Sequence, residues 1–204
     1  MTQVVNIVDF SIKILSKRIL DLEHERAREV HRQQQQFSYQ LKNGKVAFKE
    51  GISQGHKKFK VGMIPWLLSS QLRNLLSIPI IASLIIPFVI LDLSLSVYQQ
   101  LCFRLYRIPK VQRADYFVFD QHLLQYLNVI QKLNCFYCSY VSGVIGFARE
   151  IFARTEQYWC PIKHAHKVRH SHPRYINFSD YGDAGNFVKE SSQLRQSLQT
   201  GPSK

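Results

Sequence analysis

The sequence predicts a mainly α-helical protein. Apolar residues recur at helical spacing near the N-terminus, a long uncharged run occupies the middle of the chain, and helical patterns surround a later group of cysteines and histidines. We expect a long N-terminal helix, a proline-kinked membrane helix or re-entrant segment, and a small C-terminal helical Cys/His domain. The corresponding divisions are 1–60 (amphipathic helix and basic connector), 61–107 (membrane-associated helical segment), 108–178 (Cys/His-containing helical domain) and 179–204 (flexible tail).

The charge of the chain indicates an acidic partner surface. The 204 residues include 27 Lys and Arg against 14 Asp and Glu, a formal net charge of +13. The basic residues crowd both flanks of the apolar run, which favours membrane lipid with an anionic leaflet. A protein partner at the membrane is a further expectation. Nucleic acid is not expected, because its binding surfaces gather basic and aromatic residues on one face.

The first expected element is a helix over residues 4–36. Its apolar residues follow one another at gaps of three and four, so they form one stripe. These residues are Val5, Val8, Ile12, Leu15, Ile19 and Leu22. Residues 37–59 mix lysines with scattered aromatics and are expected to be a basic connector near lipid headgroups.

The membrane segment begins at Leu75 and ends at Leu91. It has about 17 uncharged residues, or about 25 Å of helix, against a hydrocarbon core of about 30 Å. Pro79 and Pro87 lie inside the run and are expected to kink it. Equal basic charge on the two flanks gives no orientation, so a single span and a re-entrant dip both stay open, as does a buried helix of a soluble protein.

Two helices are expected after the membrane segment. Residues 115–120 predict a short strand or an extended strip, and Asp120 then caps a first helix. Asn134 is expected to cap a second helix, which would place Cys135 and Cys138 at its N-terminal end with both thiols on one face.

Cysteine and histidine spacing predicts a metal site. Cys-x-x-Cys is followed about one helix later by Cys-x-x-x-His, and together they supply the four ligands of a tetrahedral zinc ion. The expected ligands are Cys135, Cys138, Cys160 and His164. An iron–sulfur cluster, a redox-active dithiol and packed free thiols remain alternatives. Expected partners of the ligands are Glu150, Glu156 and Tyr158, whereas His166, His170 and His172 lie among basic residues that disfavour a dication.

Four stretches resemble a family of uncharacterised bacterial membrane-associated proteins. They are residues 108–116, 120–128, 135–140 and 155–165, and they include Cys-Phe-Tyr-Cys and Thr-Glu-Gln-Tyr-Trp-Cys-Pro-Ile-Lys-His-Ala. The resemblance implies a bacterial membrane-associated protein and brings no activity, fold or cofactor with it. With cysteines in a chain that shows no N-terminal signal peptide, it leads us to expect the bacterial inner membrane, with the Cys/His domain on the cytoplasmic face.

Two functional classes follow from these patterns. The first is a membrane-associated binding or assembly module shaped by a structural zinc ion. The second is a membrane-bound thiol or iron–sulfur oxidoreductase component that uses Cys135 and Cys138. Whether the protein is an enzyme stays open at this stage.

Overall fold

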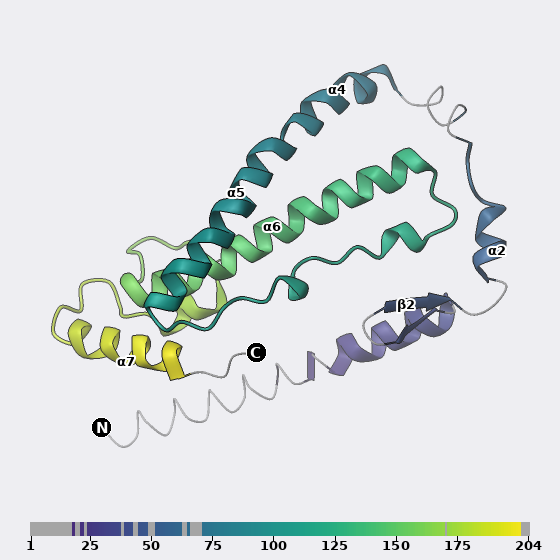
Figure 1. The fold of residues 1–204 in the computed structure, drawn as a ribbon. Coiled ribbons are helices and arrows are strands. Elements are labelled where there is room, and N and C mark those ends of the chain that lie inside the picture. Colours follow the sequence, from purple (N-terminus) through teal and green to yellow (C-terminus); the bar gives the residue numbers. More distant parts are fainter. Residues whose placement is uncertain are drawn as a thin grey trace. The chain divides into compact units, whose positions relative to one another are not determined.

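A computed structural model describes residues 18, 21–22, 24–37, 39–42, 45–48, 52–62, 65, 71–169 and 171–200. This part of the chain is mainly helical, as the sequence predicts (Figure 1). The chain divides into two compact units. Unit 1 consists of Met1–Lys60 with Leu123–Tyr126, and unit 2 of Val61–His122 with Leu127–Lys204. Each unit is described by itself.

Unit 1 contains the end of the predicted N-terminal helix. Residues 24–36 are helical, and the amide of Phe37 donates to the carbonyl of Gln33 at 2.9 Å where the helix ends. The predicted apolar stripe lies almost wholly outside the described residues, with the exception of Leu22. The side chains of residues 24–33 are exposed, in agreement with their charged sequence.

A β-hairpin and a short helix occupy the segment predicted as a basic connector. Strands β1 (Tyr39–Lys42) and β2 (Lys45–Phe48) pair antiparallel, and helix α2 (Ile52–Lys57) follows. Tyr39 lies opposite Phe48, whose ring contacts His56 at a centroid distance of 5.3 Å. The basic residues after α2 are exposed, and Phe59 stands among them at 77% exposure.

Unit 2 begins with one long apolar helix. Its parts are α4 (Leu72–Ser83), α5 (Ile85–Tyr98) and a π-helical turn (Gln99–Phe103), which follow one another in a single direction (Figure 1). α4 and α5 meet at Leu84, and Pro87 has no amide hydrogen to donate to the carbonyl four residues earlier. Among the described residues, one stretch, Leu76–Phe103, is long and apolar enough to cross a membrane, and only 11% of its most apolar window is buried.

The chain then turns back along the helix. Arg107 has a φ of 55°, and the amide of Ile108 donates to the carbonyl of Phe103 at 2.8 Å. Residues 107–122, here called the return segment, contain a short 3₁₀ turn at Arg113–Asp115, run into a second at Gln121–Leu123, and otherwise form neither helix nor strand. The strand, one of the two forms predicted for residues 115–120, is therefore wrong: Asp115 ends the first 3₁₀ turn, and residues 117–120 form neither helix nor strand.

A 31-residue helix, α6 (Val129–Trp159), replaces the two helices predicted for this region. Its N-cap is Asn128, whose side chain accepts a hydrogen bond from the amide of Gln131 at 2.9 Å, while the Gln131 side chain accepts from the amide of Asn128 at 2.9 Å. The predicted caps Asp120 and Asn134 are wrong. Asp120 precedes only a 3₁₀ turn, and Asn134 lies inside α6.

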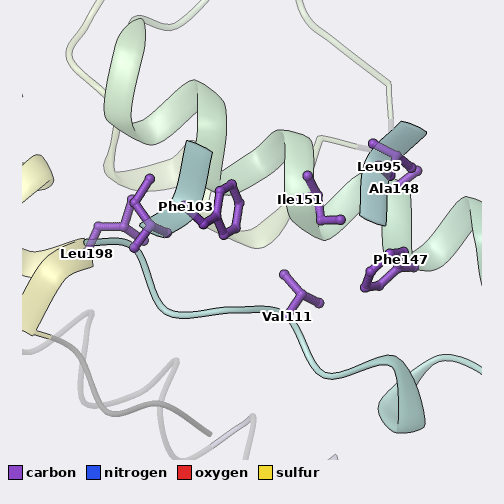
Figure 2. Packing of buried hydrophobic residues seen from close by; sticks show 8 residues of the cluster. Leu95, Phe103, Val111, Phe147, Ala148, Ile151 and Leu198 are labelled. Carbon is purple, nitrogen blue, oxygen red and sulfur yellow. The ribbon is translucent and has the colours of Figure 1, made fainter. Parts of the chain in front are cut away.

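α5 and α6 pack side by side and run in the same direction (Figure 1). The Tyr140 hydroxyl donates to Asp92 at 3.0 Å, and further along both helices Tyr98 and Thr155 share a hydrogen bond of 3.1 Å. Figure 2 shows the core between them and the return segment. The buried cluster consists of Leu95, Phe103, Ile108, Val111, Phe147, Ala148, Ile151 and Leu198.

Glycines on α6 let the return segment approach closely. A Cβ atom on Gly143 would lie 2.8 Å from the Phe117 ring, and one on Gly146 would lie 3.0 Å from the Tyr116 ring. The contact at 143 is shorter than Cβ atoms show and the contact at 146 is tight, so a side chain at 143 requires the Phe117 ring to shift and glycine is favoured at 146.

The C-terminal segment is folded in place of the predicted flexible tail. Helix α7 (Phe187–Thr200) packs on α6, and its Leu198 is 5% exposed within the core. The side-chain amide of Gln157 donates to the backbone carbonyl of Leu194 at 3.0 Å. The segment was predicted to be flexible because its composition is polar. Leu194 and Leu198 nevertheless lie four residues apart and so share one helix face.

Candidate functional site

Cys135 and Cys138 lie in the second and third turns of α6, away from its N-terminus. Both are free thiols, Cys135 half-buried and Cys138 exposed. They line a shallow hollow of about 430 Å³, here called the cysteine hollow. Its other lining residues are Tyr116, Val118, Gln121, Asn134, Ser139 and Ser142.

The cysteine hollow lies where the return segment meets α6. The Ser139 hydroxyl donates to the side-chain carbonyl of Gln121 at 2.7 Å, which joins the two elements at the rim. The hollow therefore offers two thiols beside amide and hydroxyl groups. This set of groups suits a soft metal ion or a partner side chain.

The position of the two cysteines within α6 bears on redox chemistry. Side chains at i and i+3 of a regular helix have Cβ atoms about 5–6 Å apart. A disulfide requires about 3.5–4.5 Å. A disulfide between Cys135 and Cys138 would therefore require local distortion of α6.

Cys160 and His164 lie at the opposite end of α6. Cys160 is its exposed C-cap, and parallel backbone pairing of Ile162 with Ser179 holds the turn that follows. The amide of His164 donates to the Tyr175 hydroxyl at 2.6 Å, and the two rings stack at 6.2 Å. Polar and aromatic contacts within this turn thus account for its conformation.

The structure does not bring the four predicted zinc ligands together. About 22 helical residues separate Cys138 from Cys160, or about 33 Å at 1.5 Å per residue. In the described part of the chain, no three His, Cys, Asp or Glu side chains form a group that could hold a metal ion. The donor set does not fit a zinc ion or an iron–sulfur cluster bound by all four residues of one chain.

The predicted partners of the ligands have structural contacts instead. The His172 ring and the Glu156 carboxylate share a hydrogen bond of 2.9 Å, so this histidine is part of the folded unit. Tyr158 stacks on Tyr106 at 4.8 Å. Both contacts fasten the end of α6 to neighbouring segments.

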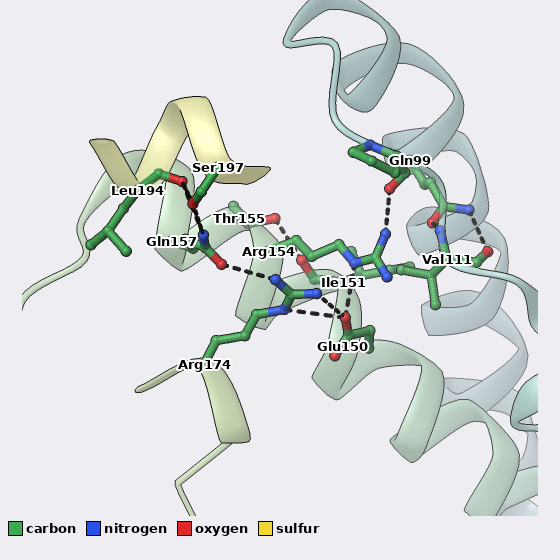
Figure 3. Close-up of polar contacts among 11 residues, drawn as sticks. Gln99, Val111, Glu150, Ile151, Arg154, Thr155, Gln157, Arg174, Leu194 and Ser197 are labelled. Carbon is green, nitrogen blue, oxygen red and sulfur yellow. Dashed lines mark hydrogen bonds and ion pairs between the residues drawn. The ribbon is translucent and has the colours of Figure 1, made fainter. Parts of the chain in front are cut away.

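Glu150 joins α6 to the 3₁₀ turn Pro173–Asn177 through a pair of arginines (Figure 3). It accepts hydrogen bonds from Arg154 at 2.8 Å and from Arg174 at 3.0 Å, and Arg174 also donates to Gln157 at 3.0 Å. Burial alone would raise the pKa of Glu150, but the hydrogen bonds and positive charges of the two arginines outweigh it and hold the pKa below its ordinary value.

A second polar group, here called the Asp92 cluster, consists of Asp92, Arg113 and Tyr140 and was not predicted from the sequence. Arg113 of the return segment forms a bidentate ion pair with the buried carboxylate of Asp92, and the Tyr140 hydroxyl donates to the same carboxylate at 3.0 Å. The Arg113 guanidinium also lies 4.3 Å from the Phe117 ring centroid. The sequence signal was Asp92 itself, a single acid in an apolar helix that requires a partner.

Comparison with known proteins adds no relative: no family model, curated protein or solved structure matches the chain. The function of the protein is therefore inferred from the geometry of each unit.

Proposed function

We propose that this protein is a membrane-associated module that binds or assembles a partner at the membrane surface. The observation that carries the proposal is the largely exposed apolar helix Leu76–Phe103. Each large aliphatic side chain left half exposed costs about 1 kcal/mol relative to burial, so a row of them favours an apolar environment. The exposed members on α4 and α5 include Leu76, Ile80, Ile86, Ile90, Leu93 and Val97.

An anionic lipid surface fits the basic residues that precede this helix in the sequence. Lys57, Lys58 and Lys60 are all exposed, and Phe59 stands among them. Basic side chains contribute about 1 kcal/mol each near an anionic leaflet, and an aromatic ring adds interfacial affinity. The bacterial inner membrane, with unit 2 on the cytoplasmic face, belongs to this proposal and is supported by the four free thiols and by the resemblance of the cysteine motifs.

The proposed binding surface is the cysteine hollow. It combines two thiols with polar side chains, and neither thiol has a disulfide partner. A zinc ion bound by Cys160 and His164 in addition is not part of the proposal, because α6 separates them from the hollow.

A thiol oxidoreductase component remains the second candidate. It is supported by the presence of Cys135 and Cys138 in one hollow, and it requires α6 to distort when the disulfide forms. Mass spectrometry after mild oxidation tests it directly. A disulfide linking residues 135 and 138 that reforms reversibly would favour this candidate over the binding module.

Membrane fractionation tests the main proposal. We expect the protein to sediment with membranes and to resist extraction by roughly 1 M salt, since apolar burial is not screened. Leu93→Lys with Val97→Lys should release it into the soluble fraction. Val188→Lys is the matched control, because Val188 is 72% exposed but lies on α7, outside both the apolar helix and the cysteine hollow. Release of the parent protein by salt alone would contradict the proposal.

A further inference from the structure

We infer that the long helix of unit 2 lies in the plane of the membrane surface, with one face of α5 in lipid, and does not cross the bilayer. The inference rests on the proposed membrane association and specifies the lipid-contacting surface. That surface, here called the outer stripe, consists of Ile86, Ile90, Leu93, Val97 and Leu101.

The two faces of α5 and its π-helical extension differ sharply. The inner face carries Asp92, Leu95, Gln99 and Phe103, all buried against unit 2. The residues of the outer stripe recur at gaps of three and four on the other side and are 58–63% exposed. An amphipathic helix of this kind lies in the interface, with its apolar face about 5–10 Å deep.

The return segment and α6 contact the inner face along most of the helix. Gln99 exchanges hydrogen bonds with the backbone of Val111, and Arg113 pairs with Asp92. Near the junction of α4 and α5, the Tyr137 hydroxyl donates to the carbonyl of Ile81 at 2.8 Å. The first of these contacts along the helix is the one at Ile81, and the roughly nine residues of α4 before it supply about 13 Å of helix.

The accompanying layer is unsuited to hydrocarbon. Most of the return segment is neither helix nor strand, so its backbone groups are not satisfied by the regular hydrogen bonds that hydrocarbon requires. It also exposes the charged side chains of Arg113, Asp115 and Asp120. A helix crossing the bilayer would carry this layer into the hydrocarbon core, whereas a helix in the membrane plane keeps it on the aqueous side.

Lipid fits the outer stripe better than a second copy of the chain. Close contacts between helices at membranes favour small residues, and the stripe consists of large aliphatic ones. At its end, Arg104, Arg107 and Lys110 are exposed where anionic headgroups would lie. The stripe also continues directly from the apolar residues of α4, which the proposed function already assigns to the membrane.

Tryptophan depth measurements test the inference. The background is Trp66→Phe with Trp159→Phe, and single tryptophans replace Ile86, Leu93 or Leu101. The full chain is reconstituted with vesicles of phosphatidylcholine and phosphatidylglycerol that carry bromine near the headgroup or near the chain end. We expect headgroup-proximal bromine to quench all three to a similar extent, by roughly half, because the stripe lies about 5–10 Å deep along its length.

A crossing helix would give a different pattern. Residues 86 and 101 would then differ in depth by about 22 Å, so one tryptophan would be quenched mainly by chain-end bromine, which would overturn the inference. Val118→Trp is the matched control on the return segment, and strong quenching there would also overturn it. A blue-shifted but unquenched stripe would indicate a second copy in place of lipid. Absence of membrane sedimentation is a separate result that would refute the proposed function itself.

Discussion

Gly143→Ala tests the packing of the return segment on α6. A Cβ at 143 would lie 2.8, 3.0 and 3.1 Å from three atoms of the Phe117 ring. The ring is confined by the Arg113 guanidinium and by the rings of Tyr140 and Phe147, so it has little room to withdraw. Overpacking costs about 1–3 kcal/mol, and alanine returns about 1 kcal/mol of helix propensity. We expect a net loss of up to about 2 kcal/mol in the free energy of unfolding, near the upper end because the ring has little room to withdraw.

The assay is urea unfolding in detergent micelles, followed by the fluorescence of Trp159 in a Trp66→Phe background. Gly55→Ala in α2 is the matched control, because a Cβ there meets nothing within 4 Å, and it should be neutral or stabilising. Phe117→Leu should remove the penalty of Gly143→Ala when the two are combined. If Gly143→Ala is stabilising in the parent, or equally destabilising beside Leu at 117, the steric argument is refuted.

Three further outcomes follow from the charged and thiol groups. Arg113→Met should destabilise unit 2 by about 1–3 kcal/mol in the same assay, because it leaves the carboxylate of Asp92 without its cation while the Arg113 side chain itself is 46% exposed, and an unchanged midpoint would contradict the ion pair. Glu150 has a lowered pKa in the folded state, so its contribution to the free energy of unfolding is present above about pH 4.3 and is lost as pH falls through the folded pKa. Glu150→Gln should therefore make the free energy of unfolding fall less steeply with decreasing pH. An equally steep fall in the variant and the parent would count against this assignment. If elemental analysis finds a bound soft metal, Cys138→Ser should remove it and Cys160→Ser should not, because α6 keeps the two thiols about 33 Å apart. Loss of the metal from both variants would support the four-ligand site instead.

The helical class and the apolar helix could be predicted because their signals are local. An uncharged run and a regular spacing of apolar residues remain visible whatever the rest of the chain does. The start of α6 was also readable, since Asn128 has Gln131 three residues later, whereas Asp120 is followed at that position by Leu123. The hairpin of unit 1 had its own signal in the Asn43-Gly44 pair between the strands.

The candidate site was harder to predict because ligand spacing does not specify direction. Cys-x-x-Cys and Cys-x-x-x-His have the spacing of metal ligands, but a single unbroken α6 carries the two pairs to opposite ends. The Asp92 cluster depends on a reversal of the chain at Arg107; Pro109 predicts that the helix ends there, but it does not predict the direction that the chain then takes. The position of α7 likewise depends on Leu198 reaching a core formed by residues about 100 positions earlier.

This long separation has a consequence for synthesis of the protein. The core joins Leu95 to Leu198, so the residues that complete it emerge about 5–20 s after the apolar helix at about 5–20 residues per second. Until α7 is made, Phe103 and Ile151 are not buried by Leu198. The apolar helix would reach the membrane before unit 2 closes, and the lipid surface would then shelter the nascent chain from aggregation while the last helix is made.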